Sequence, residues 1–391
     1  MMKLSIERKV LLLLSAVTIA LTLAGGLLGS AAATEGTYDY LRVFNEALYL
    51  AMNNYVEPVQ IEALMEGAYR GMLESLDPGN EYLTPAEYQK ATRGENAGPA
   101  EVGVNLSKRH GYAIVVSALP GSPAASSGVK SGDILLSIDG RTTRLMGAWE
   151  AAQALRGKSG SKAVLVLNPA DGGDRKTLTI ERKVLPPPQP VGNFVAPEVG
   201  VVRIAGIREG DARRLDQAIA SLRSQGIKRL LLDLRGCASE SLAEPIGMAS
   251  LFVKDGVIVS VTDRFDGDKA YRADGRRRAW SGPLALLVDG GTSRGCEALT
   301  AGLRDAAGAA VLGERTWGTG TVASILPLRN GDGVILAVGS MHSPTGKEWN
   351  GKGIDPDLVI TAEGSASGDS QRQKAIEYLR GVARPAEREA A

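Results

Sequence analysis

The sequence has few of the residues that hold metals or cross-link small domains. It contains two cysteines, Cys237 and Cys296, and two histidines among 391 residues. Two cysteines are too few for a disulfide scaffold, and their spacing does not match that of a zinc site. We therefore expect neither a metal nor a cofactor.

The chain also lacks an excess of charge of either sign. It has 45 lysine and arginine residues against 44 aspartate and glutamate residues, for a formal net charge of +1. Nucleic-acid-binding domains usually carry a concentrated basic surface, so nucleic acid is not expected as a partner. The length suffices for two or three domains with separate cores.

One long apolar run is present, near the amino end. Lys3 and Arg8 precede an apolar stretch at residues 10–29, about twenty residues long, which is the length that crosses a bilayer. Alanines at 31–33 fit a signal-peptide cleavage site, while the length and basic flank also fit an uncleaved anchor. Residues 1–33 therefore predict an exported protein of the cell envelope, either periplasmic or anchored to the inner membrane.

The next part of the chain changes from helical to β-rich texture. Residues 34–96 have apolar residues at helical spacing and predict a small helical region. Within it, the segment at 75–88 predicts a turn and then a helix capped by Thr84, which gives a helical hairpin. Residues 97–185 consist of short β-branched stretches between glycines, with one helix at 146–155, and predict a β-rich domain.

A proline-rich stretch separates this domain from the rest. The sequence VLPPPQPVG, at residues 184–192, is stiff and extended, and predicts a linker. Residues 186–362 alternate strands and helices, which is typical of an α/β core. Residues 363–391 predict a tail with a short helix.

The β-rich region contains GSPAASSGVKSGDILLSIDG, which resembles the centre of a PDZ domain of the kind found in bacterial envelope proteases. A glycine-centred loop can turn backbone N–H groups toward a carboxylate, and an edge strand can pair with a peptide. The residues expected to bind such a peptide are Val102, Gly103, Val104, Leu106, Ala151 and Leu155. The apolar ones could instead be core residues, and Glu101, beside the loop, would repel a carboxylate.

Several stretches in a fixed order resemble the carboxyl-terminal processing peptidases, also called tail-specific proteases. They are YVEPVQIEALMEGAYRGMLESLDPGNEYLTPAEY, the PDZ-like module, LLLDLRG, LVDGGTSRGCEALTAGLRDA, VLGERTWGTGTV, SPTGKEWNGKGIDPDLVI and DSQRQKAIEYLRG. The resemblance implies an α/β core of the crotonase and Clp-protease type, with an inserted β-rich PDZ domain and a small N-terminal helical region. It also implies a serine endopeptidase that processes polypeptide carboxyl termini.

The residues at the family's catalytic positions do not fit this chemistry. Alignment of the family's Ser-Ala-Ser-Ala-Ser-Glu turn on Glu297 puts Arg294 at the nucleophile position. Thr319 replaces the base lysine, and Ala323, one helical turn further on, replaces the glutamine that orients that lysine. Threonine cannot act as the base, and a permanently protonated arginine cannot replace the nucleophile.

The family's oxyanion loop is altered as well. Its Asp-Leu-Arg-Asn-Asn-Pro-Gly-Gly sequence corresponds to DLRGCASE at residues 233–240, so Ser239 and Glu240 replace the paired glycines. Side chains there would disturb the N–H groups that stabilise the oxyanion, and a carboxylate would oppose the developing negative charge. The resemblance therefore predicts a catalytically inactive homologue, with a salt bridge from Arg294 to Glu240 in the vacated site.

Two displaced nucleophiles stay open as alternatives. Ser293 adjoins the nucleophile position, but no lysine in the matching segment could serve it. Cys296 would need a partner such as His110, in the PDZ-like module, or His342, on a strand-like segment. An active carboxyl-terminal processing endopeptidase that uses Ser293 or Cys296 is the alternative function.

The two cysteines fall on loops that converge in this family's fold. In an oxidising envelope Cys237 and Cys296 could form a disulfide across the vacated site, or they could be two small buried side chains. The expected partners are polypeptide carboxyl termini or envelope proteins, with an active paralogous peptidase as a further candidate.

Overall fold

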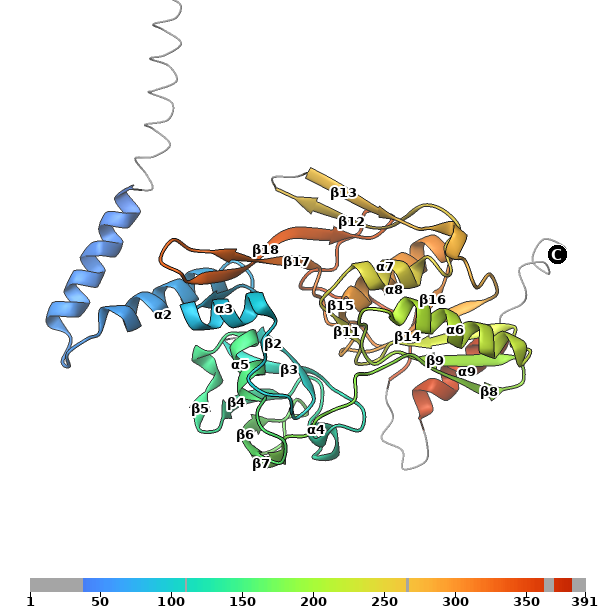
Figure 1. Ribbon diagram of the computed structural model, residues 1–391, viewed down its shortest axis with the longest axis horizontal. Coiled ribbons are helices and arrows are strands. Elements are labelled where there is room, and N and C mark those ends of the chain that lie inside the picture. The colour runs from blue at the N-terminus through green and yellow to red at the C-terminus, as the bar shows by residue number, and fades with distance from the viewer. Residues whose placement is uncertain (1–37, 110, 265–266, 362–368, 382–391) are drawn as a thin grey trace, which may run out of the picture. The chain divides into compact units, whose positions relative to one another are not determined.

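The computed structural model describes residues 38–109, 111–264, 267–361 and 369–381 (Figure 1). The chain divides into two units, of which the first ends at Tyr69 and the second begins at Arg70. In the first unit, residues 38–54 are helical. Helix α2 (Ile61–Glu74) starts in this unit and ends in the second. The predicted export segment, including residues 10–29, lies outside the described residues, and no described helix is long and apolar enough to cross a bilayer.

The β-rich domain predicted at 97–185 is a six-stranded antiparallel sheet with two short helices. The strand order is β2-β3-β4-β6-β7, with β5 beside β4 (Figure 1). The elements are β2 (Val104–Arg109), β3 (Tyr112–Ala118), α4 (Pro123–Ser126), β4 (Ile134–Ile138), β5 (Arg141–Thr142), the 3-10 turn η1 (Thr143–Leu145), α5 (Ala148–Ala154), β6 (Lys162–Asn168) and β7 (Lys176–Glu181). The helix predicted at 146–155 is α5, and β2 is an edge strand.

The α/β core is built on a second six-stranded sheet, in the order β19-β16-β14-β10-β9-β8. Its strands are parallel except for β8. They are β8 (Val191–Ala196), β9 (Val199–Arg203), β10 (Arg229–Asp233), β14 (Leu284–Val288), β16 (Ala310–Gly313) and β19 (Leu358–Val359). The helices are α6 (Asp211–Ser224), α7 (Ala243–Ala249), α8 (Gly295–Ala307) and α9 (Ser370–Gly381).

Helices cover both faces of this sheet (Figure 1). Leu230 and Leu232 of β10 join the apolar cluster that contains α6, α7 and α8. Leu231, between them, faces the opposite cluster, which includes Leu379 of α9. Side chains alternate along a strand, so a strand buried on both faces has a continuous apolar sequence such as LLLD.

A third, antiparallel sheet has the order β1-β18-β12-β13, with β17 on β18. The strands are β1 (Glu81–Leu83), β12 (Val257–Asp263), β13 (Gly267–Arg272), β17 (Thr321–Pro327) and β18 (Gly333–His342), and the remaining elements nearby are α3 (Pro85–Arg93) and the 3-10 turn η2 (Gly275–Arg277). The predicted fold class is thus confirmed. The sequence did not predict this sheet as a separate layer.

Three local predictions were wrong. In the segment at 75–88 the helix capped by Thr84 is confirmed as α3, but the helical hairpin is not, because strand β1 precedes that helix and pairs with β18, at least 250 positions away. The linker predicted at 184–192 ends at Pro190, because Val191 begins edge strand β8. Ala323 does not lie one helical turn after Thr319, because the chain there is extended and Ala323 pairs with Ala337 in β17 and β18.

Strand β1 also carries a buried carboxylate, that of Glu81. It accepts hydrogen bonds from the backbone N–H groups of Trp149 (2.9 Å) and Glu150 (3.1 Å), in the first turn of α5. Gly147 makes room for it, because a Cβ at that position would lie 1.8 Å from the carboxyl carbon. Burial raises the pKa of Glu81 to about 7, although both N–H groups oppose the change.

Glu81 should make the protein less stable as the pH rises toward neutrality. The folded-state pKa lies above the ordinary value of 4.5, so the stabilisation is complete below that pH and is lost as the pH rises to about 7. Over this range, the free energy of unfolding should fall by roughly 3 kcal/mol more in the wild type than in Glu81→Gln. Urea unfolding across the range measures the difference, and equal pH dependence in both proteins would contradict it.

Candidate active site

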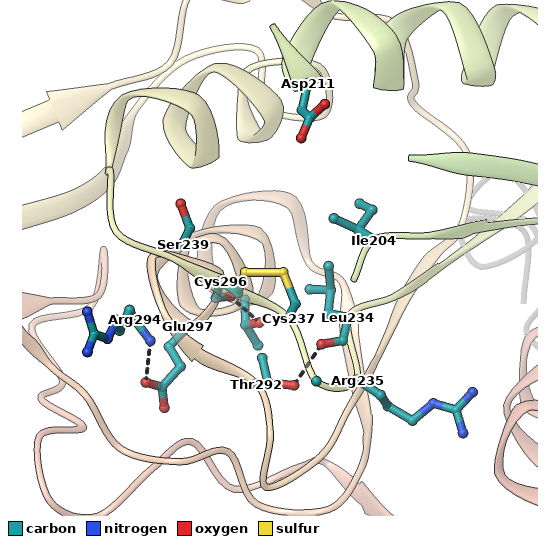
Figure 2. Close-up of a disulfide and its surroundings, with 12 residues drawn as sticks. Ile204, Asp211, Leu234, Arg235, Cys237, Ser239, Thr292, Arg294, Cys296 and Glu297 are labelled. Carbon is teal, nitrogen blue, oxygen red and sulfur yellow. Dashed lines mark hydrogen bonds between the residues drawn. A yellow bond between two sulfur atoms is a disulfide. The ribbon is translucent and has the colours of Figure 1, made fainter. Parts of the chain in front are cut away.

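The candidate site lies at the carboxyl ends of β10 and β14, which are neighbours in the parallel sheet. Strand β10 leads into the predicted oxyanion loop, and β14 leads into the turn at 289–294 before α8. The carboxyl ends of adjacent parallel strands share one edge of a sheet, where α/β proteins bind ligands. The fold therefore brings Ser239 on one side beside Arg294 on the other (Figure 2). Ser293 pairs with Ala238, and Glu240 forms an ion pair with Arg294.

The loop and the turn are bonded directly to each other through their backbones. Strand β11 (Ala238–Ser239) runs parallel to β15 (Ser293–Arg294), and the N–H of Ser293 donates to the carbonyl of Cys237 at 2.8 Å. Gly295 permits this approach, because a Cβ there would lie 3.0 Å from the Cβ of Ser239. The N–H groups of Ser293 and Arg294 are thus bonded within the protein, the second of them to Glu297.

A disulfide between Cys237 and Cys296 joins the same two segments (Figure 2). The cysteines are 59 positions apart in the sequence, and their side chains are fully buried in the apolar cluster that also contains Leu234 and Leu299. In this oxidised form, neither sulfur is a thiolate. Cys296 therefore has no nucleophile to offer in this structure.

Arg294 occupies the turn in a backbone conformation that side chains rarely adopt. Its φ is 56° and its ψ is −125°, which costs about 1–3 kcal/mol for a residue other than glycine. The guanidinium forms an ion pair with Glu240, as predicted from the sequence. The two side chains are 34% and 81% exposed, so the pair is solvated and adds little stability.

Replacing Arg294 with glycine should stabilise the fold by about 1 kcal/mol, because glycine adopts a positive φ without a clash. Glu240→Gln is the matched control, since it breaks the same ion pair and leaves the backbone of the turn unchanged. Urea unfolding of both variants measures the effect. If Arg294→Gly were less stable than the control, the backbone strain assigned to Arg294 would be wrong.

Glu297 holds the loops around this turn together from the first turn of α8. Its carboxylate is fully buried and accepts hydrogen bonds from four groups. The donors are the N–H groups of Arg294 (3.0 Å), Gly318 (2.7 Å) and Thr319 (2.8 Å) and the hydroxyl of Thr316 (2.5 Å). Burial raises the pKa of Glu297 to about 7, although these donors oppose the change.

Asp289, at the start of the turn, also holds two loops together by accepting backbone hydrogen bonds. Its carboxylate accepts the N–H groups of Gly236 (2.7 Å) and Gly291 (3.0 Å), and burial raises its pKa. A Cβ on Gly291 would lie 2.8 Å from the Cα of Gly236, so only glycine fits there. The roles of Asp289 and Glu297 were missed in the sequence, where an acidic residue at each end of the turn was the available signal.

The remaining predicted catalytic positions do not form a dyad. The N–H of Thr319 is bound by Glu297, and Ala323 lies on β17. Ser293 is 2% exposed, and no lysine or histidine in the described part of the chain forms a hydrogen bond with its hydroxyl. His342 has its Nδ1 at 3.6 Å from a carboxylate oxygen of Glu348, and His110 lies outside the described residues.

The predicted peptide-binding residues lie in β2 and α5 or directly next to them in the chain. Val102, Leu106, Ala151 and Leu155 are buried in the core of the β-rich domain, and Val104 packs against it. Gly103 has a φ of 83°, and a Cβ there would lie 2.4 Å from Ser122. Glu101 forms an ion pair with Arg156 at 2.8 Å, so its charge is compensated and the expected repulsion of a ligand is weakened.

The chain matches the models of three protein families. They are Peptidase family S41 over residues 198–360, PDZ domain over 114–169, and Activating protease CtpB N-terminal domain over 25–85. The fold and these matches define a chain with the Peptidase family S41 fold that also carries a PDZ domain. The chain belongs to the carboxyl-terminal processing peptidase family.

Similarity to individual relatives supports the same assignment. The chain is 30% identical over 329 residues to the carboxyl-terminal-processing protease of Picosynechococcus sp., covering 80% of this chain and 79% of that protein. It is 29% identical over 345 residues to the carboxy-terminal processing protease CtpA of Bacillus subtilis, covering 88% and 74%. The solved photosystem II D1 C-terminal processing protease aligns with a TM-score of 0.69 at 27% identity, covering 78% and 84%.

Proposed function

We propose that this protein is an exported pseudo-peptidase, which binds polypeptide carboxyl termini through its PDZ domain and does not hydrolyse them. The observation that carries the proposal is the direct backbone pairing of β11 with β15, with Arg294 in the turn. Serine-type hydrolysis needs a hydroxyl beside a base and N–H groups free to receive the oxyanion. Here the segment after β10 and the turn after β14 are paired with each other through β11 and β15.

The PDZ domain supports the binding half of the proposal. Its edge strand β2 lies beside α5, which is where an extended peptide can add to the sheet. The loop before β2 turns at Gly103, and Arg156 compensates the charge of Glu101. A terminal carboxylate can therefore approach this loop without meeting an unpaired negative charge.

Two observations support a location in the cell envelope. The apolar segment at residues 10–29 has the length and basic flank of a signal peptide or anchor. The disulfide between Cys237 and Cys296 is of a kind that persists in oxidising compartments and is rare in the cytosol. Envelope proteins, including an active paralogous peptidase, are therefore the proposed partners.

Incubation with an unstructured polypeptide that ends in apolar residues tests the proposal. We expect the protein to bind this polypeptide, to lose at least tenfold in affinity when its carboxyl terminus is amidated, and to leave it intact by mass spectrometry. The Bacillus subtilis relative serves as the positive control for cleavage. Cleavage that disappears in Ser293→Ala or Cys296→Ala would overturn the proposal in favour of a displaced nucleophile.

A further inference from the structure

We propose that Arg294 is the receptor for a second carboxylate of a bound polypeptide, which takes the place of Glu240 on the guanidinium. The inference rests on the proposed function, because it needs a site that holds a polypeptide without cleaving it. The carboxylate can come from an acidic side chain or from a chain terminus. It is bound at the surface of the candidate active site, separately from the PDZ domain.

The first support is the strained backbone at Arg294. A residue other than glycine keeps a φ of 56° only where the surrounding structure imposes it, and such strain collects at functional positions. Here Glu297 binds the N–H of Arg294, and β15 is paired with β11. The adjacent disulfide at Cys296 anchors the next turn of chain.

These constraints set the direction of the side chain. The guanidinium of Arg294 points away from the buried carboxylate of Glu297, which binds its backbone instead (Figure 2). The Arg294 side chain remains 34% exposed. An arginine whose backbone is already ordered loses less freedom when it binds a ligand.

The second support is that a carboxylate already occupies this guanidinium. Among the described residues, Glu240 is the one acid that forms an ion pair with Arg294. Its side chain is 81% exposed and lies in the loop after β11, so it can be exchanged at little cost. A guanidinium binds a carboxylate through two parallel N–H bonds, and a peptide carboxylate would use the same geometry.

Glu240 and a ligand therefore compete for the same donor group. Removal of the Glu240 carboxylate should increase the affinity for an acidic peptide, whereas removal of the Arg294 guanidinium should abolish the preference for acid. A merely structural ion pair would respond differently. Its loss from either side would leave peptide affinity unaltered.

Four fluorescein-labelled dodecapeptides test this competition with the full-length protein. Two have glutamate at every third position and two have glutamine there, each made with a free or an amidated carboxyl end, so side-chain and terminal carboxylates are distinguished. The variants are Arg294→Gln and Glu240→Gln. Arg315→Gln is the charge control, because Arg315 is an exposed arginine paired with exposed Asp355.

In anisotropy titrations, we expect the wild type to prefer the amidated glutamate peptide over the amidated glutamine peptide about tenfold. Arg294→Gln should remove this preference, Glu240→Gln should tighten glutamate-peptide binding about threefold, and Arg315→Gln should match the wild type. A preference for the free-acid glutamine peptide that Arg294→Gln also removes would identify a terminus as the carboxylate source.

The assignment would be overturned by no acid preference in the wild type, by an unchanged preference in Arg294→Gln, or by an equal loss in Arg315→Gln. Thermal unfolding of each variant checks that it is folded. Peptide cleavage, followed by mass spectrometry of the same samples, would contradict the proposed function. The role of Arg294 would still be judged on the affinities alone, so the two failures are distinguishable.

Discussion

Replacing Glu297 with alanine is expected to lower the free energy of unfolding by about 3–5 kcal/mol, because four donors lose the buried carboxylate that accepts from them. The donors come from the 289–294 turn and from the loop after β16. Both loops surround the candidate site, so the variant should also lose peptide binding that depends on Arg294. Urea unfolding at neutral pH measures the stability.

Two comparisons make this prediction specific. Glu377→Ala removes an exposed glutamate from helix α9 and should change stability by about 0.5 kcal/mol or less. Because the pKa of Glu297 is raised from 4.5 to about 7, the wild type is stabilised at lower pH, and the effect of Glu297→Ala should shrink as the pH rises from 4.5 to about 7. An effect no larger than that of Glu377→Ala would show that the four hydrogen bonds do not hold the loops.

Removal of the disulfide is expected to lower the free energy of unfolding by about 4 kcal/mol. The disulfide links residues 59 positions apart and so reduces the conformational entropy of the unfolded chain, a restriction that is lost without it. The double variant Cys237→Ala/Cys296→Ala should unfold at a correspondingly lower guanidinium concentration than the oxidised wild type. Both sulfurs are fully buried, so reduction of the folded protein should be slow.

Reductant provides the internal control for the disulfide. It should destabilise the wild type and leave the double variant unchanged. Thiol titration of the unfolded wild type should find no free thiol before reduction and two afterwards. Two free thiols before reduction, or equal unfolding midpoints with and without reductant, would contradict the prediction.

The sequence alone predicted much of the fold, because the signals involved are local. The alternation of strands and helices from residue 186 onward, the helix at 146–155 and the PDZ resemblance all depend on neighbouring residues. The pairing of Arg294 with Glu240 was also accessible, since alignment with a known family placed both residues at one site. The charges then made a salt bridge the natural outcome.

The predictions that failed depend on contacts between distant segments. Three residues at Glu81–Leu83 are too short to register as a strand, and they become one by pairing with β18. The charge of Glu101 looked unfavourable until Arg156, 55 positions away, was found beside it. Ala323 was placed one helical turn after Thr319, although the segment has no helical periodicity. The pairing of β17 with β18, which makes the segment extended, is visible only in the structure.

The sequence by itself determined the family, the order of domains and the residues that the alignment places at the family's nucleophile and base positions. These properties are written in local patterns and in motif order. Only the tertiary structure decided how the loops at the candidate site bind one another. Glu297, Asp289 and the backbone of β11 satisfy groups from separate parts of the chain, and such partners are identified only when the fold brings them together.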